Sequence, residues 1–191
     1  MKKLALLLVA AACGKSDSSS APPATPIDLA AVNALVPADL KDKLVFEQRD
    51  LVEERGRHSK TTYTLAAPKD WEQGKMFASL EPKRDANLGF FTKIIVGSNC
   101  DGSCEPKDWA KTSEKVNFSQ FRTGWKITKD EQAKTSHLMI AEKDDQTNVT
   151  YAWWADGARK YYSCSASLEG EIKAAADAFA KACQAVAIKG D

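Results

Sequence analysis

Two strand-like segments near the end of the chain, residues 148–156 (NVTYAWWAD) and 159–167 (RKYYSCSAS), constrain the fold most. The dipeptide Asp156-Gly157 between them favours a two-residue hairpin turn. With that turn, Tyr151 pairs with Tyr162. The two segments are therefore predicted to form neighbouring antiparallel strands.

This hairpin carries bulky aromatic side chains on both of its faces, because successive residues of a strand point in opposite directions. One face holds Val149, Tyr151, Trp153, Tyr162 and Cys164. The other face holds Thr150, Ala152, Trp154, Tyr161 and Ser163. A sheet with one face in water does not need aromatic residues on that face. We therefore expect helices or a long loop to cover both sides.

The rest of the chain from residue 27 contains further strand-like and helical patterns. Strand-like runs occupy 43–54, 58–67, 88–98, 124–130 and 136–144, and helical patterns occupy 27–40, 106–115 and 168–187. The 88–98 run (LGFFTKIIVGS) is apolar on both faces, so we place it centrally in the sheet and expect cover on both sides.

The tetrapeptide Pro-Lys-Asp-Trp occurs twice, at 68–71 and 106–109. Proline in a first turn loses no hydrogen bond, and an early aspartate suits the helix dipole. Both copies are therefore predicted to start helices, with Trp71 and Trp109 as core anchors.

The last predicted helix has one apolar stripe. Its members recur at steps of three and four residues: Ile172, Ala175, Ala176, Phe179, Cys183 and Val186. Cys183 therefore points at the sheet. Cys164 lies on an aromatic face of the strand just before this helix, so the two sulfur atoms can meet.

The order of these elements over residues 42–187, together with the local sequence YTLAAPKDW at 63–71, resembles the PsbP-like family. The resemblance implies an α+β fold: a mainly antiparallel sheet of six to seven strands, helices on both faces, and the C-terminal helix packed on the sheet. It also implies binding or assembly rather than catalysis. No functional residue of the family can be matched to this chain.

The first residues resemble a bacterial lipoprotein signal. Two lysines precede an apolar run from Leu4 to Ala12, which is too short to span a membrane, and Cys13 follows. In such signals the cysteine is lipidated and becomes the new N-terminus. Ala10 stands where these signals usually carry leucine, so an ordinary secretory signal with cleavage after an Ala-x-Ala site is the alternative. Both readings predict export.

The chain is accordingly divided into a signal peptide (1–12), a lipidated cysteine with a Ser/Pro/Ala linker (13–26) and one globular domain (27–191). The formal charge is +1, and loss of Lys2 and Lys3 with the signal changes it to −1. There is no basic excess to favour nucleic acid as a partner.

Five cysteines are present, and lipidation of Cys13 leaves four in an oxidising compartment. We expect disulfides Cys100–Cys104 and Cys164–Cys183. The two crossed pairings stay open, although they require the loop at Cys100 to reach the last helix and the strand before it.

An alternative treats Cys100 and Cys104 as free thiols that bind copper or zinc, with His137 as a third ligand, or that act in thiol-redox chemistry. The pattern of parallel strands that usually surrounds such a pair is missing from the sequence. For His137, a plain position at the end of a strand is the simpler interpretation.

No catalytic motif and no cofactor motif occurs in the sequence, so we expect a non-enzyme without a cofactor. Trp154, Arg159 and Tyr161 form a candidate binding surface, because arginine stacks on aromatic rings and exposed aromatic rings dock sugars or peptides. The alternative is that a helix or the N-terminal segment covers them. The sequence thus predicts an extracytoplasmic lipoprotein, anchored to a bacterial membrane, that binds an envelope protein or ligand.

Overall fold

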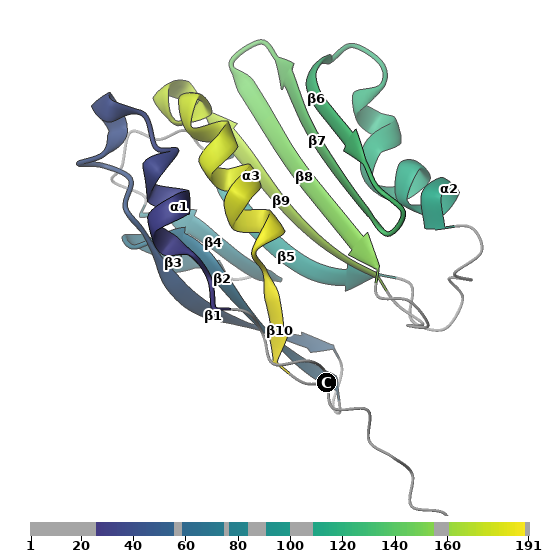
Figure 1. Ribbon diagram of the computed structural model, residues 1–191, viewed down its shortest axis with the longest axis horizontal. Coiled ribbons are helices and arrows are strands. Elements are labelled where there is room, and N and C mark those ends of the chain that lie inside the picture. Colours follow the sequence, from purple (N-terminus) through teal and green to yellow (C-terminus); the bar gives the residue numbers. More distant parts are fainter. Residues whose placement is uncertain are drawn as a thin grey trace, which may run out of the picture.

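The computed structural model describes residues 26–55, 59–74, 77–83, 91–99, 109–154 and 161–189. These residues form an α+β fold with two antiparallel sheets and a few short helices (Figure 1). The larger sheet has seven strands in the order β3-β4-β5-β9-β8-β7-β6. They are β3 (Trp71–Gln73), β4 (Ala78–Pro82), β5 (Lys93–Asn99), β6 (Lys126–Gln132), β7 (Ser136–Lys143), β8 (Gln146–Trp154) and β9 (Tyr161–Glu169). The predicted fold class, a mainly antiparallel α+β sheet of this size, is confirmed.

A smaller sheet has the strand order β1-β2-β10, with β1 (Phe46–Arg55), β2 (Ser59–Pro68) and β10 (Ala187–Lys189). The predicted strands at 43–54 and 58–67 correspond to β1 and β2, which pair along their whole length. A turn at residues 69–70 then leads from β2 into β3. One stretch of chain therefore passes from the smaller sheet into the larger one.

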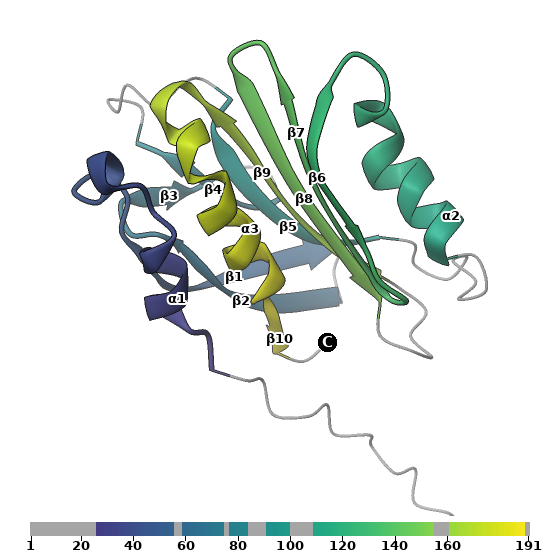
Figure 2. The ribbon, with the colours of Figure 1, turned by 45° about the horizontal axis from the view of Figure 1, so that its top comes forward.

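The helices fall into three groups. Near the start lie α1 (Leu29–Ala34) and the 3-10 turn η1 (Ala38–Leu40), and near the end lie η5 (Gly170–Ala175) and α3 (Ala176–Gln184). Between β5 and β6, helix α2 (Trp109–Ser113) continues without a break into the π-helix η3 (Glu114–Phe118) and the turn η4 (Ser119–Phe121). We call residues 109–121 the α2 segment. In Figures 1 and 2, α3 lies across the larger sheet and the α2 segment lies beside β6 and β7.

The main core lies on the face of the larger sheet that bears Val149 and Cys164, which we call the α3 face. Phe179 of α3 is fully buried there, and its ring contacts Phe46 at 5.1 Å and Trp71 at 5.5 Å between centroids. The same core includes side chains of α1 and of the smaller sheet. Both sheets therefore share one hydrophobic interior.

A second cluster lies on the opposite face, which bears Ala152 and Tyr161 and which we call the α2 face. Phe118 and Phe121 of the α2 segment pack there against Met139, Ala141 and Ala152. Further along this face, Lys93 and Ile95 of β5 and the side chains of β9 beyond Tyr161 are half-buried.

The predicted central strand at 88–98 appears as β5, third in the order. Ile94 and Val96 are buried on the α3 face, whereas Lys93 and Ile95 on the α2 face are only half-buried. The structure therefore shows full cover on the α3 side of this strand, and cover on its α2 side stays a prediction.

The β8–β9 register differs from the prediction by two residues. Tyr151 pairs with Cys164, and Trp153 pairs with Tyr162. A shift of two leaves every side chain on its predicted face, because side chains alternate with a period of two. The two-residue turn at Asp156-Gly157 was the wrong basis for register, whereas the division of the aromatic residues between the faces is correct.

Two predicted helix boundaries are also wrong. The first Pro-Lys-Asp-Trp copy is a turn that leads into strand β3, not a helix start, although Trp71 is buried as expected. The sequence predicts the last helix over 168–187, but Leu168 still belongs to strand β9 and Ala187 is the first residue of β10. In both cases strand pairing to a neighbour overrides the local helical preference. No helix in the described ranges is long and apolar enough to cross a membrane.

Candidate functional site

Several of the predicted site residues fall outside the described ranges. These are Cys13, Cys100, Cys104 and Arg159. Trp154 is half-buried, and Tyr161 is only 1% exposed beneath Trp109, whose ring lies edge-on at 5.4 Å. The proposed Trp154–Arg159–Tyr161 surface is therefore wrong as far as Tyr161 is concerned, because its phenol ring belongs to the core of the α2 face.

The structure joins Cys164 of β9 to Cys183 of α3 through a disulfide, with their Cα atoms 5.3 Å apart. Both residues are fully buried on the α3 face. The apolar stripe of the last helix predicted that Cys183 faces the sheet near Cys164, and the structure has these two residues bonded. The disulfide holds α3 against the sheet.

His137 of β7 lies on the α2 face and is 3% exposed. Its Nε2 atom is 2.6 Å from Oδ1 of Asp130 on the neighbouring strand β6, and the ring of Phe118 lies tilted over the imidazole with 3.9 Å between the ring centroids. No group of three or more metal-ligating side chains occurs among the described residues. Within those ranges, His137 is engaged by a carboxylate and an aromatic ring.

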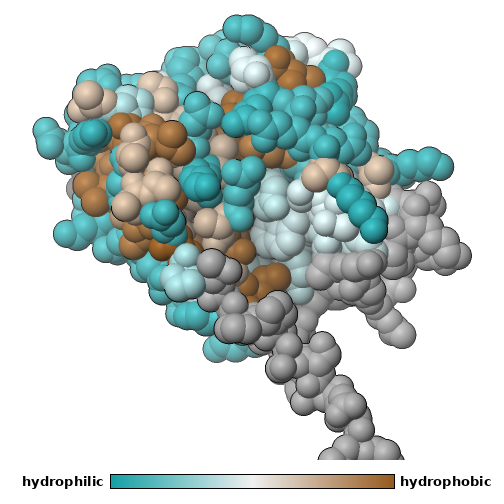
Figure 3. Space-filling model, viewed as in Figure 1, coloured by the Kyte–Doolittle hydropathy of each residue, from teal (hydrophilic) through white to brown (hydrophobic). Residues whose placement is uncertain are grey.

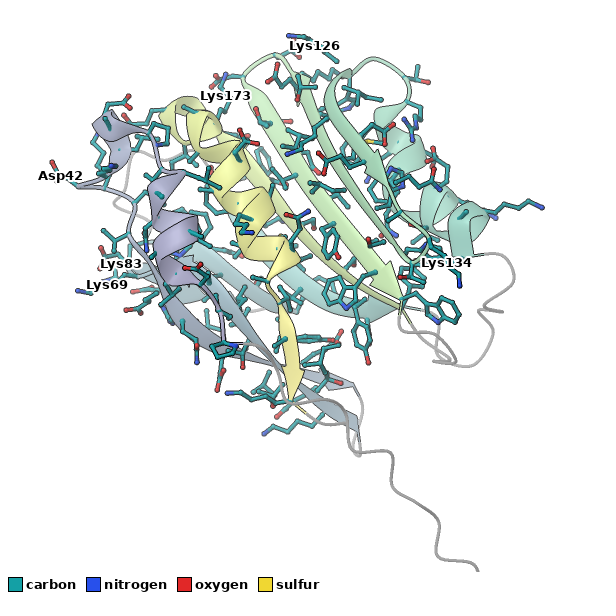
Figure 4. All side chains as sticks on the ribbon, viewed as in Figure 1. Asp42, Lys69, Lys83, Lys126, Lys134 and Lys173 are labelled. Carbon is teal, nitrogen blue, oxygen red and sulfur yellow. A yellow bond between two sulfur atoms is a disulfide. The ribbon has the colours of Figure 1, made fainter. Side chains whose placement is uncertain are left out.

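A chain of charges connects this histidine to the α2 segment. Arg122 donates to both oxygens of Glu114 at 2.8 Å, and its Nη1 donates to Oδ2 of Asp130 at 2.6 Å. The hydrogen bonds from Arg122 hold the pKa of Glu114 below its usual value. Burial opposes ionisation of Asp130, but Arg122 and His137 outweigh it and lower the pKa of that carboxyl. In Figure 4, Lys126 marks the start of strand β6, which carries Asp130, and Lys134 lies just beyond the end of that strand.

Beside Phe118 and Phe121, the inward side of the α2 segment also carries buried polar groups, which is unusual for a helix that packs on a sheet. Trp109, Ser113 and Asn117 recur every four residues, so they share one side of the helix. All three are at least nine-tenths buried. Among the described residues, Trp109 Nε1, Ser113 Oγ, Asn117 Nδ2 and Tyr161 Oη have no partner at hydrogen-bond geometry, although Asn117 and Tyr161 lie close enough to interact.

Tyr161 belongs to this polar group through its position on β9. Burial raises the pKa of its phenol, and Asn117 beside it partly offsets that rise. We call Trp109, Ser113, Asn117 and Tyr161 the buried polar group. Each unpartnered buried polar atom costs about 1–3 kcal/mol, and a whole domain has a net stability of only about 5–15 kcal/mol. A stripe that served packing alone would be apolar.

A second notable feature is a row of aromatic rings on the α3 face. Tyr151 and Trp153 stack at 5.3 Å, Trp153 and Tyr162 stack at 5.6 Å, and Tyr63 of the smaller sheet meets Tyr162 edge-on at 6.3 Å. Tyr151 and Trp153 are half-buried, so part of this row reaches the surface. In Figure 3 the surface beside α3 has intermediate hydropathy, in contrast to the more hydrophobic surface over α1.

The buried end of this aromatic row is fixed by Glu53 of β1. Tyr63 Oη donates to Glu53 Oε2 at 2.6 Å, and the backbone N–H and hydroxyl of Ser98 on β5 donate to the same oxygen at 3.3 Å. Burial, and then Glu53, raise the pKa of Tyr63. One carboxylate therefore connects the two sheets.

Sequence reasoning found the aromatic residues but missed the buried polar group. The predicted helix at 106–115 ends before Asn117, so it includes Trp109 and Ser113 but not the third residue on that side of the helix. The four-residue spacing of Trp109, Ser113 and Asn117 was the available signal. Their burial depends on the sheet and could not be obtained from the helix sequence alone.

No family model and no curated protein matches this chain. Among solved structures, it is similar to the Ran-binding protein Mog1p of Saccharomyces cerevisiae, with 11% identity and a TM-score of 0.47 over 74% of this chain and 95% of that one. A Mog1 point mutant is similar with 14% identity and a TM-score of 0.44, again over 74% and 95%. A likeness of this size carries no functional inference.

Proposed function

We propose that this chain is an exported lipoprotein, anchored to a bacterial membrane through Cys13, whose domain binds a protein or ligand of the cell envelope without catalysing a reaction. In this proposal the domain is a PsbP-like sandwich with helices on both faces of the larger sheet. The binding part rests on one observation, the row formed by Tyr151, Trp153 and Tyr162. The buried Cys164–Cys183 disulfide is what an oxidising compartment permits.

The aromatic row supports binding because of how it is held. Its inner end is fixed by Tyr63 and Glu53, and its outer end reaches solvent at Tyr151 and Trp153. Rings locked by packing lose little conformational entropy when a partner binds, and they bury a large area. A rigid, partly exposed aromatic row is therefore suited to contact a partner.

Intact-cell crosslinking tests the binding role. A photo-crosslinking residue in place of Tyr151 should capture a discrete partner, and Trp153→Ala should reduce the yield of that product. Phe77→Ala is the matched control, because Phe77 is an aromatic residue outside the row with 70% exposure. Equal yields from the two alanine variants would exclude the row as the binding surface.

Membrane anchoring is tested separately by cell fractionation. Cys13→Ser should move the protein from the membrane fraction to the soluble extracytoplasmic fraction, because stable anchoring requires the lipid chains. Ser18→Ala, in the same linker, should leave the protein in the membrane fraction. Retention of the Cys13→Ser protein in the membrane would disprove lipid anchoring at this residue.

Thiol counting on non-reduced, denatured protein distinguishes the alternative metal or redox carrier. The proposed function expects Cys100 and Cys104 to be joined, so no free thiol should be found. Two free thiols, or metal retained through purification, would favour the carrier and contradict the proposal.

A further inference from the structure

We infer that the α2 face carries a binding site for a small uncharged polyhydroxylated ligand, a sugar or a polyol, between the α2 segment and strand β9. This site is distinct from the aromatic row, which lies on the opposite face of the sheet. The inference therefore does not depend on the proposed envelope partner or on the lipid anchor.

The first observation is the buried polar group. Trp109, Ser113 and Tyr161 are 7%, 1% and 1% exposed, and Asn117 is 9% exposed, yet one polar atom of each has no hydrogen-bond partner within the described part of the chain. Buried polar atoms in folded proteins are nearly always hydrogen-bonded, and exceptions point to a role other than packing. Four such atoms in one group point to a ligand that supplies hydrogen bonds.

The second observation is that the same face continues along β9 as a row of hydroxyl groups. Ser163, Ser165 and Ser167 follow Tyr161 at two-residue steps, so all four side chains share the α2 face. The three serines are half-buried rather than buried. On β8, Thr150 is opposite Ser165 and donates to Asn148 at 2.7 Å. The serine row gives a ligand an approach to the buried group.

The chemistry of these side chains identifies the ligand class. An indole N–H only donates, an amide both donates and accepts, and hydroxyl groups do either. Sugar hydroxyl groups do both as well, so they can satisfy the whole set.

An anion is a poorer fit than a neutral ligand. No residue of the buried polar group or of the serine row is charged, and the nearby Arg122 is already bonded to both Glu114 and Asp130.

Two variants test the site in the full-length protein, purified in a detergent without a sugar headgroup. Titrations with glucose, N-acetylglucosamine and glycerol are followed by tryptophan fluorescence and by amide NMR signals of residues 109–121 and 161–167. At least one of these ligands should bind with millimolar or better affinity. Tyr161→Phe and Asn117→Ala should each weaken binding about tenfold, as expected when one buried hydrogen bond to a ligand is lost.

Gln184→Ala is the control, because it removes an exposed polar side chain at the end of α3, on the opposite side of the sheet. It should leave ligand affinity unchanged. Without ligand, Tyr161→Phe should unfold at the same or a higher temperature than the wild type, since this hydroxyl makes no hydrogen bond to the residues that the structure describes. A lower unfolding temperature would show that this hydroxyl is structural and would contradict the inference.

Two further results would overturn the inference of a sugar or polyol site. One is that none of the three ligands changes the fluorescence or the NMR signals. The other is that acetate or phosphate binds at these residues while the neutral ligands do not.

Discussion

At the scale of single residues, Asp130 has the most clearly defined electrostatic role. Its carboxylate accepts from Arg122 and from the buried His137, each at 2.6 Å, and its pKa lies below the usual value. A carboxyl whose pKa is lower in the folded than in the unfolded protein stabilises the fold above the unfolded pKa of about 3.9. That stabilisation is lost as the pH falls through the folded pKa.

We therefore predict that Asp130→Asn lowers the free energy of unfolding by about 1 kcal/mol near neutral pH, the size expected for a partly exposed charged pair. The difference from wild type should stay constant down to about pH 5 and shrink at lower pH. Urea unfolding at a series of pH values measures it. Asp39→Asn, in the exposed turn η1, is the control, and a difference that grows on acidification would contradict the assigned role.

The residue scale also shows what alternation alone can predict. The alternation of side chains along a strand correctly placed Tyr151 and Tyr161 on opposite faces, because successive residues of a pleated strand point to opposite sides of the sheet. It could not tell which of the two would be buried. Tyr161 is buried because the α2 segment, from a different part of the chain, packs on it. Exposure is set by tertiary packing, and the sequence pattern of the strand does not contain it.

At the scale of elements, Asn33 fixes helix α1 to strand β1. Its Oδ1 accepts from the backbone N–H of Phe46 at 2.8 Å, and its Nδ2 donates to the carbonyl oxygens of Phe46 and Leu29 at 3.0 and 2.9 Å. The side-chain amide thus satisfies both backbone groups at the start of β1. A helix of only six residues needs such an attachment, since short helices are marginal by themselves.

Asn33→Ala should lower the free energy of unfolding by about 2 kcal/mol, because backbone polar groups of Phe46 lose their partners. Asn33→Asp keeps the acceptor for the Phe46 N–H but sets a carboxylate oxygen against the carbonyl oxygens of Phe46 and Leu29, so it should not restore the stability. Chemical denaturation of the three proteins measures the effect. An alanine variant as stable as wild type would show that α1 is held by its apolar side alone.

The disulfide between β9 and α3 gives a second prediction at this scale. Replacing both Cys164 and Cys183 by alanine opens a loop with a sequence separation of 19. In the chain-entropy model such a crosslink contributes about 3 kcal/mol. The double variant should therefore melt roughly 6–12 °C below wild type, as measured by thermal unfolding.

Reducing agent provides the matched control for this disulfide. It should lower the melting temperature of the wild type more than that of the double variant. Equal melting temperatures for the two oxidised proteins would mean that the crosslink adds nothing to stability.

Local patterns predicted the strands better than the helix boundaries. β6 to β9 emerged from alternating runs, since each such run has one consistent periodicity. The stretch at 168–175 has a helical spacing, yet Leu168 and Glu169 pair with β8, at Thr147 and Gln146, before the chain turns. Trp71 likewise pairs with Pro82 of β4. Hydrogen bonds to a distant strand decide these boundaries.

At the scale of the whole molecule, the contacts between the two sheets decide whether the sheets unfold together. They share one core, and Glu53 of the smaller sheet accepts hydrogen bonds from Ser98 of the larger. Strand β10 connects the sheets a second time, because the chain runs from α3 on the larger sheet into β10, where Ile188 pairs with Tyr63 of the smaller sheet. We therefore expect one cooperative transition in urea.

Two probes can test that expectation, because all five tryptophans lie outside the smaller sheet. Tryptophan fluorescence therefore follows the larger sheet and the α2 segment, whereas far-UV circular dichroism follows both sheets. The two unfolding curves should coincide for wild type.

Glu53→Ala should lower the free energy of unfolding by about 1–2 kcal/mol, because it leaves the buried hydroxyl of Tyr63 without its acceptor. The neighbouring Glu54→Ala should change it by less than about 0.5 kcal/mol, since that side chain is mostly exposed. The curves of Glu53→Ala should still coincide, because the shared core remains. If they separate, the carboxylate is what couples the sheets, and the common core is too weak to do so.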